Sequence, residues 1–224
     1  MRNGQQEFVF RKRGGARKGA GRKRALPGRP RVPHRTRMDH KRAHPVHVTL
    51  RARAGLPPLR DHGIFAEARD AIAMASRSRA ASSTFRVVEF SIQNDHAHFI
   101  VEAHDKETLT RGLRGLVIRF ARAVNRALHV RGPVWEDRYH ARELTTPRAV
   151  RNAIVYVLMN AKKHRMRIAQ VDHFSSAPWF GGFAQRIDVA IEPSPVFASK
   201  TWLGAMGWRR RGLVGLDEQP RAPN

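Results

Sequence analysis

The order in which two kinds of hydrophobic periodicity follow each other along the chain limits its fold more than any other feature. Three stretches alternate apolar and polar residues as half-buried strands do: 46–51, 85–92 and 96–102. Three have the spacing of amphipathic helices: 64–79, 106–128 and 147–164. A further strand is expected over 134–144. The order β-α-β-β-α-β-α predicts an α+β fold with a ferredoxin-like split β-α-β antiparallel sheet, helices on one face and an added C-terminal helix.

The segments outside this pattern differ from it in composition. Residues 1–43 are rich in Gly, Pro, Arg and Lys, and the first 45 residues hold 15 Lys and Arg against Glu7 and Asp39. Such a segment cannot bury enough apolar surface to fold, so we expect a disordered basic arm. The predicted domain spans 44–180, and 181–224 is interpreted as an irregular basic C-terminal tail.

The charge of the chain points to a polyanionic partner. A formal net charge of +25 far exceeds what solubility needs, and nucleic acid is the commonest such partner. We expect no membrane partner, because no apolar stretch approaches the roughly 20 residues of a bilayer span, and we expect a cytoplasmic, nucleoid-associated protein. With no Cys in the chain, a metal ion would have to be held by His, carboxylate or amide groups.

Paired histidines stand on one predicted strand. Side chains two residues apart in a strand point to the same face, so His96 and His98 are expected side by side. The first strand also has a polar side, formed by His47, Thr49 and Arg51 opposite its apolar side. The two imidazoles on 96–102 can chelate one ion, or they can be polar residues on the solvated side of a half-buried strand.

The last predicted helix carries a polar row beside its apolar stripe. Asn152, Tyr156 and Asn160 are each four residues apart and therefore stack on one face. A phenol and a carboxamide one turn apart can serve one site as nucleophile and oxygen ligand. The alternative is a Tyr and two Asn that make ordinary hydrogen bonds at the edge of the domain.

Three segments, in this order, resemble the single-tyrosine HUH transposases (IS200-like transposases), in particular the REP-associated tyrosine transposases. Residues 94–101 (NDHAHFIV) resemble the Asn-x-His-hydrophobic-His strand of that family. Residues 134–140 (VWEDRYH) resemble its hydrophobic-Trp-x-x-Arg-Tyr strand, and residues 156–164 (YVLMNAKKH) its Tyr-x-x-x-Asn-Pro-x-Lys helix. The chain departs from the family at Ala97, where a bulkier apolar residue is usual, and at Ala161, which replaces Pro.

The resemblance implies a role for each matching residue. His96 and His98 would be metal ligands, Asn160 the third ligand and Tyr156 the nucleophile on a catalytic C-terminal helix. The cofactor would be Mg²⁺ or Mn²⁺, and imidazole suits Mn²⁺ better. Tyr139, on the second segment, would be structural or face the substrate.

The implied function is a metal-dependent single-strand DNA endonuclease and strand transferase that forms a 5′-phosphotyrosine intermediate on hairpin or palindromic DNA. Arginines on 106–128 are expected to track the DNA backbone, or to be a solvated helix face. Within the arm, Gly28 to Arg31 resemble an AT-hook core, although a plain polybasic tail has the same composition. The expected DNA-binding residues are Arg29, Arg31, Arg111, Arg114, Arg119, Arg122 and Lys163.

Two other functions agree with the same residues. One is a non-catalytic DNA- or RNA-binding protein built on a domesticated HUH scaffold. The other is a His-ligated metallohydrolase that cleaves without a covalent intermediate. The sequence leaves open whether the chain acts as a monomer or a homodimer, in which the Tyr156 helix can serve the metal site of the partner.

Overall fold

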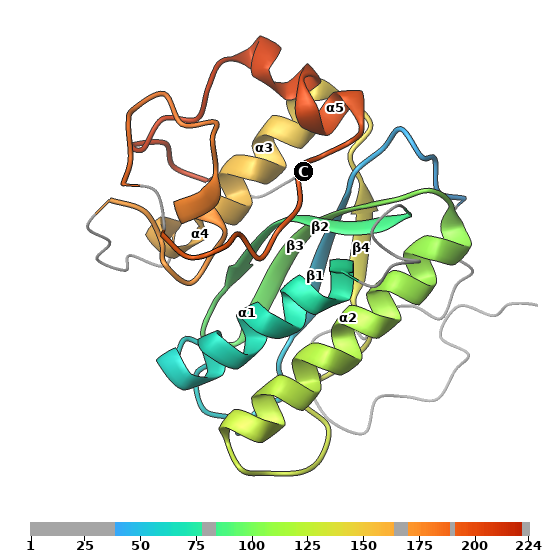
Figure 1. Cartoon of the computed structure of the whole chain (residues 1–224), viewed down its shortest axis with the longest axis vertical. Helices are drawn as coiled ribbons and strands as arrows, with labels where there is room; N and C mark the ends of the chain where they lie inside the picture. The colour runs from blue at the N-terminus through green and yellow to red at the C-terminus, as the bar shows by residue number, and fades with distance from the viewer. Residues whose placement is uncertain (1–38, 78–83, 164–169, 189–190, 221–224) are drawn as a thin grey trace, which may run out of the picture. The chain divides into compact units, whose positions relative to one another are not determined.

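The computed structural model describes residues 39–77, 84–163, 170–188 and 191–220, which belong to the compact unit Val32–Asn224 (Figure 1). The basic arm, including Arg29 and Arg31, lies outside the described residues. A four-stranded antiparallel sheet has the order β2-β3-β1-β4. The strands are β1 (Val46–Arg51), β2 (Phe85–Ile92), β3 (His96–Ala103) and β4 (His140–Glu143). This is the order of a split β-α-β sheet, and the predicted fold class is confirmed.

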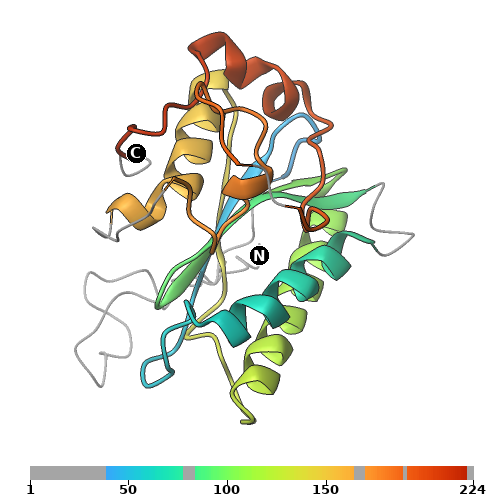
Figure 2. The same cartoon turned by 60° about the vertical axis from the view of Figure 1, so that its left-hand side comes forward.

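Helices α1 (His62–Arg77) and α2 (Lys106–Ala127) cover one face of the sheet (Figures 1 and 2). The alternate strand residues that point toward them, such as Val48 and Phe99, are fully buried in this first core. A capping box starts α2: the Thr108 backbone N–H donates to Asp105 Oδ1 (2.8 Å), and the Asp105 N–H donates to Thr108 Oγ1 (3.0 Å). The buried stripe of α2 is Leu109, Leu113, Leu116, Phe120, Ala123 and Val124.

A second core lies on the other face of the sheet, where α3 (Pro147–Leu158) packs over Ile100. Thr146 caps this helix through its hydroxyl, and Pro147 occupies the first turn. The single helix expected over 147–164 is divided, because Met159 leaves the helical region (φ −100°, ψ 11°) before the short helix α4 (Asn160–Lys163).

The chain after α4 completes the second core and belongs to the same compact unit. It contains the short helices η1 (Ala177–Trp179), α5 (Trp202–Ala205) and η2 (Gly207–Arg211). Arg60 binds Asp172 through two guanidinium–carboxylate contacts of 2.9 and 2.8 Å, and both side chains are largely buried. The buried apolar side chains of the chain after α4 are Val171, Ala177, Phe180, Phe183, Leu203, Trp208 and Val214.

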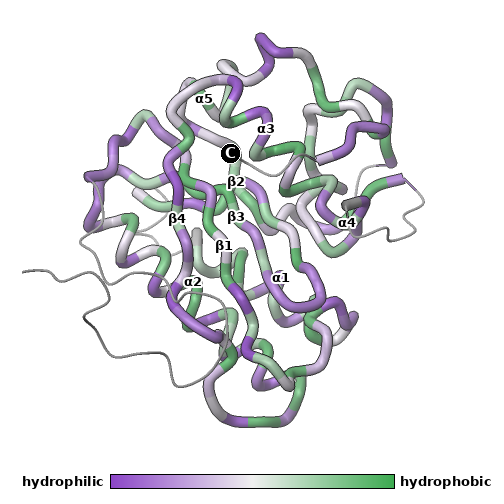
Figure 3. Tube along the Cα trace, turned by 180° about the vertical axis from the view of Figure 1, so that it is seen from behind, coloured by the Kyte–Doolittle hydropathy of each residue, from purple (hydrophilic) through white to green (hydrophobic). Residues whose placement is uncertain are grey.

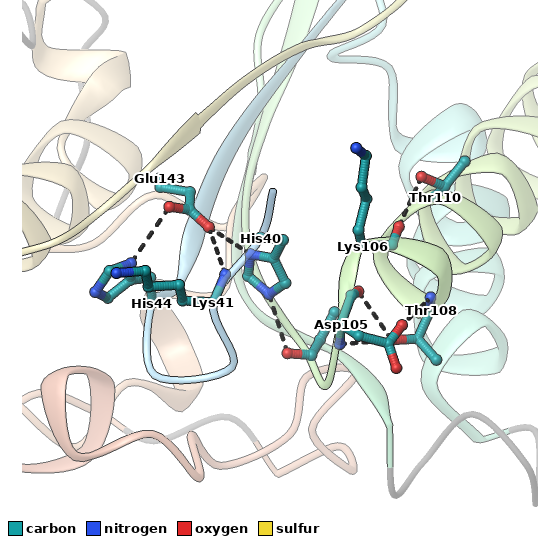
Figure 4. Close-up of polar contacts among 9 residues, drawn as sticks. His40, Lys41, His44, Asp105, Lys106, Thr108, Thr110 and Glu143 are labelled. Atoms are coloured by element: carbon teal, nitrogen blue, oxygen red, sulfur yellow. Dashed lines mark hydrogen bonds and ion pairs between the residues drawn. The ribbon is translucent and has the colours of Figure 1, made fainter. Parts of the chain in front are cut away.

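The chain enters the domain along the edge strand β4, as Figure 4 shows. Glu143 Oε1 lies 2.7 Å from His40 Nδ1 and accepts the Lys41 backbone N–H (2.9 Å), while Oε2 lies 3.3 Å from His44 Nδ1. Partial burial raises the pKa of Glu143, but the hydrogen bonds from Lys41, His44 and His40 outweigh it and the pKa falls below its usual value. These contacts attach residues 40–44 to the sheet.

The last strand is shorter than expected. Of residues 134–144 only His140–Glu143 form β4, which Figure 3 shows at the edge of the sheet. Residues 134–139 form a loop held by Trp135, whose indole N–H donates to the Val117 carbonyl (3.1 Å) and whose ring packs edge-on against Phe120. Tyr139 is partly buried against the first core. The aromatic residues of this segment anchor a loop where a strand was predicted.

Substitutions at two glycines of α2 can test how closely this helix approaches the sheet. A methyl group on Gly112 would overlap the fully buried ring of Phe85, whereas one on Gly115 would meet only the flexible end of Arg119 (2.7 Å). We expect Gly112→Ala to lower the free energy of unfolding by about 1–3 kcal/mol. Gly115→Ala should raise it by up to about 1 kcal/mol, because alanine favours the helix. Urea denaturation measures both, and equal stability of the two variants would contradict the close approach.

Candidate active site

The two histidines of β3 lie on the sheet face that α3 covers. Their ring centres are 4.7 Å apart. His98 is buried, with 4% of its surface exposed, and His96 is partly exposed at the end of the strand. The alternation of the strand therefore separates these imidazoles from Phe99, which belongs to the first core.

Each imidazole is held through its Nδ1 atom. His96 Nδ1 lies 2.6 Å from Asp95 Oδ1, and the other oxygen of Asp95 accepts a hydrogen bond from Arg51 Nη2 (2.9 Å). His98 Nδ1 lies 3.1 Å from Thr49 Oγ1 on the neighbouring strand β1. Contacts of this kind orient metal-binding histidines and make Nε2 the ligand atom.

Electrostatics keep the Asp95 carboxyl charged. Partial burial raises its pKa, but the hydrogen bond and charge of His96 and the charge of Arg51 outweigh that effect, so the pKa of Asp95 lies below its usual value. Arg51 also reaches Glu136 in the loop before β4 (3.2 Å). The loop 134–139 is thereby tied to the strand that carries Thr49.

Tyr156 reaches the same place from α3. Its half-buried ring stands edge-on to His98, with the ring centres 5.0 Å apart. The phenol and the β3 imidazole therefore meet on one face of the sheet within a single chain. Asn152, one turn earlier on α3, is exposed to solvent.

Asn160 follows at the first position of α4 and is fully buried. Neither the oxygen nor the nitrogen of its carboxamide has a hydrogen-bond partner within the described parts of the chain. An unsatisfied buried amide is costly, by about 1–3 kcal/mol for each group. A water molecule or a bound ion can satisfy such a side chain.

One further side chain belongs to this cluster and was not among the expected site residues. His47, on the polar side of β1, lies 5.2 Å from His98 and 5.8 Å from Tyr156 between ring centres. Burial, and after it the electrostatic effects of His140 and Arg142 on β4, lower the pKa of His47 to about 4. Its imidazole is therefore neutral at pH 7. The only sequence signal was its place on the strand, beside Thr49 and Arg51.

The donor set suits a divalent cation with mixed nitrogen and oxygen ligands. Over the described ranges no three His, Asp or Glu side chains are grouped closely enough to hold an ion. The two β3 imidazoles would consequently need an oxygen donor of another type. The unpaired carboxamide of Asn160 is such a donor, so the residues present fit the ion.

The comparison with protein families gave one similarity. The profile of the family described as "Transposase IS200 like" matches residues 56–158, which include His96, His98 and Tyr156. Over these residues the chain is similar to the IS200-like transposases. The match ends before Asn160 and begins after His47.

A solved structure has a fold similar to that of this chain. It is the structure of a REP-associated tyrosine transposase bound to a REP hairpin, with a TM-score of 0.51 and 19% sequence identity. The similarity covers 65% of this chain and 82% of the other. A comparison with curated proteins gave no match. The family and the fold agree with the resemblance found in the sequence.

The expected DNA-binding arginines of α2 do not lie at the histidines. The four arginines Arg111, Arg114, Arg119 and Arg122 are exposed on the outer side of α2, across the sheet from Tyr156. Lys163 is the last residue of α4, close in sequence to Asn160. Within the described residues, no helix is long and apolar enough to cross a membrane.

The buried acid Glu89 is not part of the histidine cluster. Glu89 lines a cavity of about 440 Å³ between the sheet and the C-terminal segment, together with Glu102, Ile154 and Trp208. Its Oε2 lies 2.5 Å from Ser176 Oγ. Burial raises the pKa of Glu89 to about 8, although the hydrogen bond with Ser176 acts in the opposite direction. At neutral pH this carboxyl is mostly protonated.

The raised pKa predicts how stability depends on pH. Because the pKa of Glu89 rises from 4.5 to about 8 on folding, its contribution is fully present below pH 4.5 and is lost as the pH rises through 8. The free energy of unfolding should fall over this range by up to about 1.4 kcal/mol per pH unit. Glu89→Gln, which stays neutral, should flatten the dependence in urea denaturation at several pH values. An unchanged slope in this variant would refute the assignment.

Proposed function

We propose that the chain is a metal-dependent single-strand DNA endonuclease and strand transferase that uses Tyr156 as its nucleophile. The observation that carries the proposal is the contact between the rings of Tyr156 and His98, which come from different elements and meet on one face of the sheet. A phenol beside two oriented imidazoles suits nucleophilic attack on a phosphodiester. The similarity of residues 56–158 to the IS200-like transposase family supports the same reaction.

In this proposal Nε2 of His96, Nε2 of His98 and the carboxamide oxygen of Asn160 hold one Mg²⁺ or Mn²⁺ ion. When bound, such an ion supplies Lewis-acid polarisation of the scissile phosphate. The two imidazoles favour Mn²⁺ over Mg²⁺. Asp95 and Thr49 keep the imidazoles in the ligand orientation through their Nδ1 contacts.

The cleavage step exchanges one phosphate ester for another. The phenolic oxygen of Tyr156 attacks phosphorus, and a bond from phosphorus to the Tyr156 oxygen forms. The bond from phosphorus to the 3′ oxygen breaks, and the phenolic proton ends on that oxygen as a 3′-OH. The DNA on the 3′ side of the scissile phosphate remains joined to the protein through its 5′ phosphate, as a 5′-phosphotyrosine, which conserves the ester bond for transfer to another strand.

The proposed substrate is single-stranded or hairpin DNA. Tyr156 stands on a folded helix, and a scissile phosphate reaches it more readily in an unpaired strand. The related structure is of a transposase bound to a REP hairpin, which supports a hairpin substrate here. We assign Arg29, Arg31, the arginines of α2 and Lys163 to contacts with the DNA backbone. A protein with this activity would work in the cytoplasm, at the nucleoid.

The two tyrosines of the chain allow a matched test. With Mn²⁺ and a palindromic single strand, wild-type protein should form a covalent adduct that survives denaturing electrophoresis. Tyr156→Phe should abolish the adduct, at least about a thousandfold, because no other group replaces the phenol. Tyr139→Phe should retain it, because Tyr139 packs against the first core. DNA affinity should stay the same in the Tyr156 variant.

The other two functions predict different results. Cleavage that survives Tyr156→Phe would indicate a metallohydrolase without a covalent intermediate. DNA binding by the wild type without cleavage of any hairpin, in Mg²⁺ or Mn²⁺, would indicate a binding protein on a domesticated scaffold.

The α2 arginines can be tested through the salt dependence of binding. If Arg119 and Arg122 each neutralise one phosphate, replacing both by Gln should reduce the slope of log K against log salt for a single strand by about 1.4. Arg126→Gln is the control, because that guanidinium is already paired with Glu67 (2.7 Å). An unchanged slope in the double variant would identify the row as a solvated helix face.

A further inference from the structure

His47 is the one member of the histidine cluster that the proposed reaction does not use. It lies nine residues before the start of the match to the transposase family. The pairing of β1 with β3 at the centre of the sheet fixes its position. In this register His47 pairs with Ile100, and Thr49 pairs with His98. His47 and His98 are therefore diagonal neighbours on the face below α3.

Two imidazoles stand beside the phenol ring of Tyr156. The Tyr156 ring stands edge-on to His98 and to His47, at angles of 74° and 75° and at 5.0 and 5.8 Å between ring centres. The two imidazoles are tilted by only 31° to each other, 5.2 Å apart. They form one wall, against which the tyrosine ring stands.

A structural role alone does not explain why this wall contains a second histidine. His47 is 6% exposed, and its Nε2 is fully buried with no hydrogen-bond partner among the described residues. An apolar side chain would fill the same space without the cost of an unpaired polar atom, about 1–3 kcal/mol. A buried polar atom without a partner beside a reactive group is typical of a site that is completed when it is loaded.

We infer that His47 is a positioning residue for the nucleophile: its ring holds the Tyr156 phenol against His98, and its Nε2 forms a hydrogen bond with the phenolic hydroxyl in the loaded site. The inference rests on the proposed function, since it assigns Tyr156 as the nucleophile. His47 is not a ligand of the ion in this assignment.

The cleavage kinetics of the wild type, His47→Leu and His47→Gln distinguish a positioning role of His47 from a packing role. His47→Leu replaces the imidazole by an apolar side chain of moderate size without a polar atom. This variant should lower kcat for hairpin cleavage about 100-fold, as expected for a misplaced reacting group. KM and Mn²⁺ affinity should stay the same. His47→Gln retains a group that can hydrogen-bond, and it should recover at least about a tenth of the wild-type kcat. Thermal melting shows whether each variant is folded.

A spectroscopic measurement reports on the phenol without metal or DNA. Protein labelled with 3-fluorotyrosine should give two ¹⁹F resonances, because the chain has two tyrosines, and Tyr139→Phe assigns them. His47→Leu and His47→Gln should each move the Tyr156 resonance by more than its linewidth and leave that of Tyr139 in place. A variant that is merely less stable would not select one of the two signals.

Each result decides the matter. Three results would overturn the role of His47: a wild-type kcat in His47→Leu, equal losses of kcat in the Leu and Gln variants, or a Tyr156 resonance that does not move. In each case, adduct formation by the wild type would still support the proposed function. Loss of Mn²⁺ affinity in His47→Leu would make His47 a ligand and also overturn the inference. Absence of any adduct in the wild type would overturn both proposals together.

Discussion

The pairing of β1 with β3 at the centre of the sheet is the interaction on which the rest of the structure depends. Its register places Thr49 opposite His98 and His47 opposite Ile100, so a shift of either strand by one residue would turn the imidazoles of that strand toward the first core. The apolar residues on the other side of both strands prevent that shift, because they are fully buried beneath α1 and α2. The site is held in place by a hydrophobic core that lies on the opposite face.

Burial of polar groups under α3 distinguishes the second face from the first. His47, His98 and Asn160 are buried, and His96 and Tyr156 are partly buried, where a purely structural core would contain apolar side chains. The cost of burying them is reduced by specific contacts, such as Asp95 with His96 and Thr49 with His98, but not at Asn160. The C-terminal segment and α3 complete this face, and they leave a cavity beside the buried, mostly protonated Glu89.

Much of the fold could be predicted from the sequence because period and length determine single elements. The bounds predicted for β2 are those observed, and α2 and β3 each differ by one residue at the end. Residues 134–139 were predicted as part of a strand over 134–144. In the structure these residues form a loop, in which the indole of Trp135 binds the carbonyl of Val117 on α2. Such a contact between distant residues has no local signal.

The sequence by itself determined the chemistry that is available: two imidazoles on one side of a strand, a phenol and a carboxamide four residues apart on a helix, and no cysteine. Only the tertiary structure decided which groups meet, because contact between β3 and α3 depends on how the helix packs across the sheet. It brought His47 to Tyr156 from a strand more than a hundred residues away, and it left the arginines of α2 on the far side. Local periodicity fixes the face of an element on which a side chain lies, but long-range packing fixes what that face touches.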